Sequence, residues 1–150
     1  MSAFYDITTK IKDHFVSDPF INTVHYNDID GAELKKMQIY PLANMVVNSL
    51  TEQGPIIRVQ MEITIVDIVY DNKDIDTGFY GNDNTMDVDN GTSMAHFRLS
   101  SLLRRGDLNA DKFQLANNPV CNPVQGDEGN NAQGMRAIYE IDIPNEMCIS

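Results

Sequence analysis

The opening of the chain has the apolar periodicity of an amphipathic helix. Apolar side chains recur at spacings of three and four residues, which places them on one helical face: Phe4, Ile7, Ile11 and Phe15. Ser2 is expected to cap the start of this helix. Asp18-Pro19 is expected to end it, because a residue before proline avoids helical backbone angles.

Residues 56–70 give the strongest strand pattern. Apolar side chains at alternate positions, from Ile57 to Ile65, are separated by polar ones, from Arg58 to Thr64. This alternation predicts one buried and one solvated face, which is typical of an antiparallel sheet covered on one side. Beyond Thr64 the second face becomes apolar too. That change predicts contact with a neighbouring element or a partner subunit through three side chains: Val66, Ile68 and Tyr70.

Several shorter segments also predict strands. They cover residues 21–26, 37–50, 113–115 and 120–124, with Pro41 marking a strand start, an edge or a bulge. A closing strand over residues 135–143 alternates clearly, and Ile138 is the apolar exception on its polar face. Between the long strand and the next helix lies a polar loop, residues 71–85, in which Phe79 and Tyr80 could anchor a contact.

A second helix is predicted over residues 87–105, with Asp87 or Asp89 as its cap. Its expected apolar face consists of Met94, Phe97, Leu99, Leu102 and Leu103. A basic cluster, Arg98, Arg104 and Arg105, occupies the second half of this helix before Gly106. These cations either complement the helix dipole or form a patch for an acidic neighbour subunit.

The order of elements predicts a single α+β domain over residues 1–150. A mostly antiparallel β-sheet with two α-helices packed on one face is the simplest arrangement, because no regular alternation of strand and helix favours a parallel sheet. No internal repeat and no linker divides the chain.

Composition narrows the classes of function. Hydrophobic residues make up 42% of the chain, enough for a buried core, and the net charge is -11. Such a surface repels phosphate, so we expect neither sequence-specific nucleic-acid binding nor binding to an anionic membrane. The N-terminal residues do not have the pattern of a secretory signal. Cys121 and Cys148 lie outside any CxxC motif and are expected to be free thiols, with a disulfide between them as the alternative.

Candidate chemistry is sparse. Asp83, Asp87 and Asp89 form an acidic cluster, but taking Gly91 as the glycine of a calcium loop puts Met86 and Val88 at ligand positions. The three histidines, His14, His25 and His96, have no metal-site spacing. Phosphate-loop, dinucleotide and nucleophile-elbow motifs do not occur. We therefore expect no enzyme activity, no metal and no cofactor, with a metal-assisted hydrolase built on the three aspartates as the alternative.

Three segments and the order of elements resemble small tail-completion proteins of tailed bacteriophages. The segments are residues 4–15 (FYDITTKIKDHF), 39–48 (IYPLANMVVN) and 102–108 (LLRRGDL). The order of an N-terminal helix, strands, a long loop, a second helix and closing strands is similar to that of tail terminators. The resemblance spans most of the chain and implies a fold like that of tail-tube proteins.

The resemblance also implies a function and partners. Tail terminators form a ring, commonly hexameric, that ends polymerisation of the tail tube and joins it to the neck. The expected partners are other copies of the chain, the tail-tube protein and neck or connector proteins, with genomic DNA only as passing cargo. The expected location is the virion tail or neck, and the host cytoplasm during assembly. A head-tail connector adaptor and a host-interacting binding protein are the alternatives.

Overall fold

The computed structural model describes residues 3–26, 40–68, 85–106, 113–125 and 132–145. These residues form two helices and six strands, which confirms the predicted α+β class. In chain order the elements are α1 (Ala3–Ser17), β1 (Thr23–Tyr26), β2 (Leu42–Gln53), β3 (Ile56–Ile68), α2 (Thr85–Arg105), β4 (Gln114–Leu115), β5 (Asn122–Gln125) and β6 (Ala132–Pro144). No helix in the described ranges is long and apolar enough to cross a membrane.

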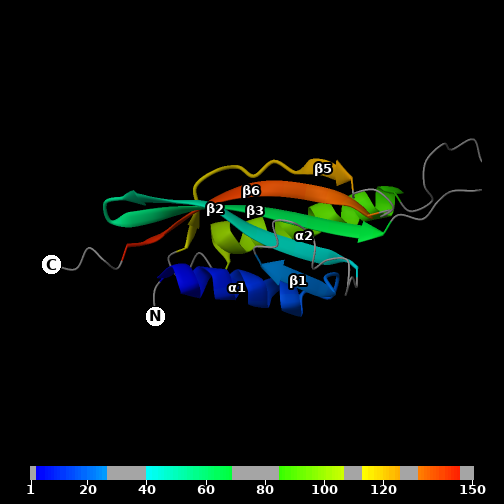
Figure 1. The fold of residues 1–150 in the computed structure, drawn as a ribbon, viewed down its shortest axis with the longest axis horizontal. Helices are drawn as coiled ribbons and strands as arrows, with labels where there is room; N and C mark the ends of the chain where they lie inside the picture. Colours follow the sequence, from blue (N-terminus) through cyan, green and yellow to red (C-terminus); the bar gives the residue numbers. More distant parts are fainter. Residues whose placement is uncertain (1–2, 27–39, 69–84, 107–112, 126–131, 146–150) are drawn as a thin grey trace, which may run out of the picture.

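The sheet is built around one long antiparallel pair (Figure 1). Strand β3 pairs with β6 along its whole length, from Ile56 opposite Pro144 to Ile68 opposite Ala132. The described strands follow the order β1-β2-β3-β6-β4, and β5 also pairs with β6. All pairings are antiparallel except that of β1 with β2, which is parallel. The predicted antiparallel character therefore holds for all but one edge of the sheet.

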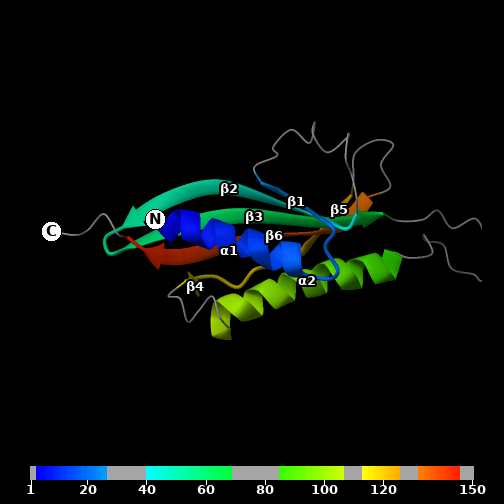
Figure 2. The same cartoon turned by 90° about the horizontal axis from the view of Figure 1, so that it is seen from below.

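Both helices contribute to one hydrophobic core on the same face of the sheet. Figure 2 shows α1 crossing in front of the central strands, with α2 running beside it. The predicted stripe of α1 is confirmed, because Ile7, Ile11 and Phe15 are fully buried. The predicted alternation of the long strands is also confirmed. Their fully or almost fully buried residues are Val59, Met61, Ile63 and Ile65 on β3, and Ala137, Tyr139, Ile141 and Ile143 on β6.

Two predictions about α2 are wrong. The helix begins at Thr85, so Asp87 and Asp89 lie inside its first turns and neither is the cap. Met94 and Phe97 are 44% and 50% exposed, because they lie on the side of the helix opposite the sheet. The face that packs on the sheet carries Val88, Ala95, Leu99 and Leu103, all buried and spaced at four or seven residues.

Strands β2 and β3 form a hairpin that reaches past both helices (Figures 1 and 2). Its two-residue turn is Gly54-Pro55, and Gly54 has a φ of 66°, a left-handed conformation that favours glycine. The pairing register shifts between Val47 and Ser49, which marks a β-bulge in β2. Beyond Met45, no described strand pairs with the outer edge of β2.

Candidate interaction surfaces

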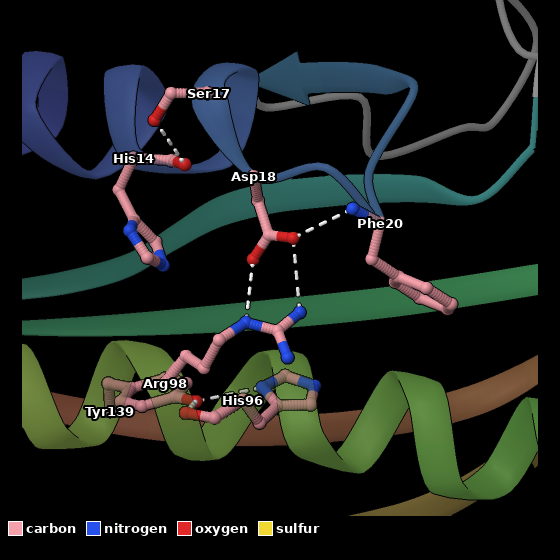
Figure 3. A network of polar contacts seen from close by, with 7 residues as sticks. All are labelled: His14, Ser17, Asp18, Phe20, His96, Arg98 and Tyr139. Carbon is pink, nitrogen blue, oxygen red and sulfur yellow. Dashed lines mark hydrogen bonds and ion pairs between the residues drawn. The ribbon is translucent and has the colours of Figure 1, made fainter.

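An ion pair joins the end of α1 to the middle of α2 (Figure 3). The guanidinium of Arg98 donates from Nε to Oδ2 of Asp18 at 2.9 Å and from a terminal nitrogen to Oδ1 at 3.0 Å. Oδ1 also accepts the backbone N–H of Phe20 at 2.9 Å. The Asp18 side chain is only 2% exposed. The N–H groups of Arg98 and Phe20 therefore replace the water that the carboxylate loses on folding. Arg98, predicted as an interface residue, thus makes a bidentate contact within its own chain.

A buried hydrogen-bonded pair, His96 and Tyr139, lies beneath this junction. His96 Nε2 lies 2.9 Å from the carbonyl oxygen of Met135, so Nε2 carries the proton and donates it. Nδ1, 2.8 Å from the Tyr139 hydroxyl, then accepts from it. Burial lowers the pKa of His96 to about 4, against a smaller opposing effect of the Met135 carbonyl. Burial likewise raises the pKa of Tyr139 above its ordinary value, so both groups are neutral at pH 7.

His14 lies on the α1 side of the same junction and points toward α2 (Figure 3). Burial lowers its pKa most strongly, while the Asp18 carboxylate raises it and the Arg98 guanidinium lowers it. Its Nε2 is buried and has no hydrogen-bond partner within the described part of the chain. Two histidines whose pKa is lowered by burial, and a carboxylate whose charge is balanced by Arg98, favour a packing role for this polar junction, in which each side chain is oriented by its neighbours.

The described residues contain no group of three or more His, Cys, Asp or Glu side chains that could hold a metal ion. Of the acidic cluster, Asp87 is exposed and Asp89 is half-buried on α2, while Asp83 lies outside the described residues. Cys121 is a free, half-buried thiol whose pKa is raised by burial, which reduces its reactivity.

The face of the sheet opposite the helices is polar and internally paired. Arg58 makes a bidentate contact with Asp142 at 2.8 and 3.2 Å across β3 and β6. Arg136 lies 3.6 Å from Glu62 on the same strand pair. Ile138, the predicted apolar exception, is 41% exposed on this face. The paired charges leave this surface hydrophilic, with Ile138 as an isolated apolar spot.

Two of the predicted interface residues lie at the far end of that face. Val66 is half-buried and Ile68 is 39% exposed, two positions apart on β3 and therefore on the same side of the sheet. Tyr70, Phe79 and Tyr80 lie outside the described residues, so the predicted apolar group is described only in part.

The outer face of α2 exposes three large apolar side chains, Met86, Met94 and Phe97. Six exposed residues share this face, and we call them the α2 outer stripe: Met86, Asn90, Met94, Phe97, Ser101 and Arg105. Sequence reasoning assigned Met94 and Phe97 to the core and so missed them as surface residues. The available signal was the four- and seven-residue spacing of Val88, Ala95 and Leu99, which sets the buried side of the helix.

The last turn of α2 carries two cations with different environments. Arg104 donates to the carbonyl oxygen of Asn117 at 2.8 Å and to Oδ1 of Asn118 at 2.7 Å. Arg105 is exposed and, among the Lys and Arg residues that the structure describes, is the one without an ion pair or hydrogen bond. Of the predicted basic cluster, Arg105 alone thus has no partner among the residues that the structure describes.

A scan against protein-family models and a search of curated proteins both find no match for this chain. The fold is that of an α+β domain in which helices cover one face of the sheet and charged residues cover the other. Exposed apolar residues lie on a helix and on a hairpin.

Proposed function

We propose that this chain is a structural assembly protein of a tailed-bacteriophage virion, which forms a ring that caps the tail tube, ends its polymerisation and joins it to the neck. The observation that carries the proposal is the α2 outer stripe, where Met94 and Phe97 stand exposed on the helical side of the molecule. Exposed apolar residues grouped on one element are typical of surfaces that bind other proteins.

The architecture and the sequence support the same class. Residues 4–15, 39–48 and 102–108 and the order of elements resemble tail terminators. The projecting β2–β3 hairpin and the open outer edge of β2 offer further surfaces for neighbouring subunits. A net charge of -11 suits a conduit for DNA, because like charge lets the genome pass without adhesion.

The test is a nonsense mutation in the gene, in a phage that carries it, combined with mass spectrometry of purified wild-type virions. We expect the polypeptide at a few copies per virion. We also expect the mutant to accumulate unjoined heads together with tails of irregular length, and a plasmid copy of the gene to restore joining.

Two outcomes would reject the proposal. One is a mutant that assembles infectious virions with tails of normal length. The other is the absence of the polypeptide from virions together with recovery of a host protein in pull-downs, which would favour the host-interacting alternative.

A further inference from the structure

All of the α2 outer stripe except Met86 lies on a helix segment that contains no acidic residue. From Asn90 to Arg105 the chain has no Asp or Glu, although it carries 22 of them in 150 residues. The exposed side chains of the segment include Met94, Phe97 and the unpartnered cation Arg105. Methionine, aromatic residues and arginine are the types enriched in protein interfaces, whereas Glu, Asp and Lys are depleted there.

The tip of the β2–β3 hairpin has the complementary chemistry. Leu50 is 53% exposed, and Glu52 lies two residues further on, so both point to the same side of β2. Leu50 is opposite Val59 and Glu52 is opposite Ile57, which places both on the sheet face that the helices cover elsewhere. The hairpin extends beyond both helices here (Figures 1 and 2), so neither helix covers this end, although Asn145 donates hydrogen bonds to the carbonyl oxygens of Gly54 and Pro55 in the turn.

Glu52 supplies the acidic side chain of this surface. It is exposed, and no ion pair or hydrogen bond of its side chain occurs among the described residues. One surface thus presents an apolar residue beside a free carboxylate, and the other presents apolar residues beside a free guanidinium. The apolar residue precedes the charge by two positions on the strand, about 7 Å, and by eight positions on the helix, about 12 Å, so the long side chains of Glu52 and Arg105 have to span the difference.

We propose that the hairpin tip of one copy of this chain docks on the α2 outer stripe of a second copy, with Leu50 against Met94 and Phe97, and Glu52 against Arg105. Two chains of net charge -11 repel each other, so a contact between them requires a surface free of acid. The α2 segment is such a surface. The two patches differ, so the contact is heterologous and can be repeated around a closed ring.

The proposal gives the ring of the proposed function its subunit contact and rests on that function for its biological role. The contact itself is testable with purified protein. Sedimentation velocity of the full chain between about 1 and 500 μM is expected to show concentration-dependent oligomers. Phe97→Ser and Leu50→Ser should each weaken association at least about tenfold, since apolar residues at the centre of a contact contribute most of the binding free energy. Ile138→Ser, which removes a similarly exposed side chain from the opposite sheet face, should leave association unchanged.

A charge exchange tests the pairing directly. Glu52→Arg and Arg105→Glu should each weaken association, and the double variant should restore it, because it recreates one opposite-charge pair in reverse. Cross-linking provides a second readout in a Cys121→Ser, Cys148→Ser background. A mixture of Leu50→Cys and Phe97→Cys chains should form a mixed disulfide dimer, whereas each variant alone should form little.

A chain that stays monomeric at 500 μM and forms no mixed disulfide overturns the inference, and so does association that is unaffected by Leu50→Ser and Phe97→Ser. These outcomes are distinguishable from failure of the proposed function. If virions contain the polypeptide and need it for head joining, the proposed function holds and the subunits contact each other through a different surface. Association of the pure protein without any role in virions would leave the contact standing alone.

Discussion

At the scale of single residues, Gly134 of β6 lies opposite Val66 of β3, where the paired backbone leaves no room for a side chain. A Cβ at this position would lie 1.9 Å from the carbonyl oxygen of Ile65 and 2.8 Å from Cα of Val66, both backbone atoms of the paired strand. Backbone in the middle of a sheet cannot move aside without breaking its ladder. We expect Gly134→Ala to lower the free energy of unfolding by more than about 3 kcal/mol, measured by urea denaturation.

Gly91 provides the matched control. A Cβ there would lie 2.6 Å from the edge of the Phe20 ring, which is a side chain that can shift. Alanine also stabilises a helix interior by about 1 kcal/mol relative to glycine. Gly91→Ala should therefore cost clearly less than Gly134→Ala. Equal costs for the two variants would contradict the argument that backbone contact is what forbids a side chain in β6.

At the scale of elements, the Asp18–Arg98 pair holds α1 against α2. Arg98→Met keeps the apolar stem but removes both guanidinium donors from the buried carboxylate of Asp18, which retains only the backbone N–H of Phe20 among the donors described above. We expect the free energy of unfolding to fall by about 2 kcal/mol. This is less than the ~3–5 kcal/mol typical of breaking a fully buried ion pair, because the Arg98 side chain is 42% exposed. Urea denaturation measures the loss, and hydrogen exchange should show faster opening of α1.

Arg98→Lys separates charge from geometry. Lysine retains the positive charge but cannot donate two parallel hydrogen bonds to one carboxylate. The fall in the free energy of unfolding should therefore lie between zero and that of Arg98→Met. A lysine variant as unstable as the methionine variant would show that fork geometry outweighs charge. An Arg98→Met variant as stable as wild type would show that the pair does not hold the helices together.

The periodicity of the sequence predicts elements far better than it predicts their partners. The α1 stripe and the alternation of β3 and β6 follow from local spacing, and both are confirmed. The parallel pairing of β1 with β2 has no local signal, since it depends on where the chain returns after β1. Likewise, Asp18 has a clear sequence role as the residue before Pro19, yet its ion pair with Arg98 joins residues 80 positions apart.

The outer face of α2 shows why the site was harder to predict than the fold. Met94 and Phe97 are as hydrophobic as Leu99 and Leu103, so hydrophobicity alone assigns all four to the core. A helix of this length can bury only one side against a sheet, and the spacing of Val88, Ala95 and Leu99 selects that side. The remaining apolar residues are then surface features, which is what makes them candidates for binding.

At the scale of the whole molecule, buried histidine makes stability depend on pH. The pKa of His96 is about 4 in the folded chain against an ordinary value of 6.5, so between these values the unfolded chain binds a proton that the folded chain does not. The stability that depends on neutral His96 is fully present above pH 6.5 and is lost as the pH falls toward 4. It amounts to about 3 kcal/mol at 1.36 kcal/mol per pKa unit. The lowered pKa of His14 acts in the same direction.

His96→Gln removes this titration while keeping a side chain that can form hydrogen bonds, so the comparison isolates His96 from the many carboxylates that also titrate. Urea denaturation at pH 7.0 and pH 4.5 measures the free energy of unfolding of both chains. The wild type should lose more stability than the variant over this interval, by about 2–3 kcal/mol. The variant is expected to be less stable at pH 7, because the Tyr139 hydroxyl and the Met135 carbonyl lose well-placed partners. If both chains lose the same amount on acidification, His96 does not stay neutral in the folded core, and the acid sensitivity of the molecule arises from His14 and the carboxylates.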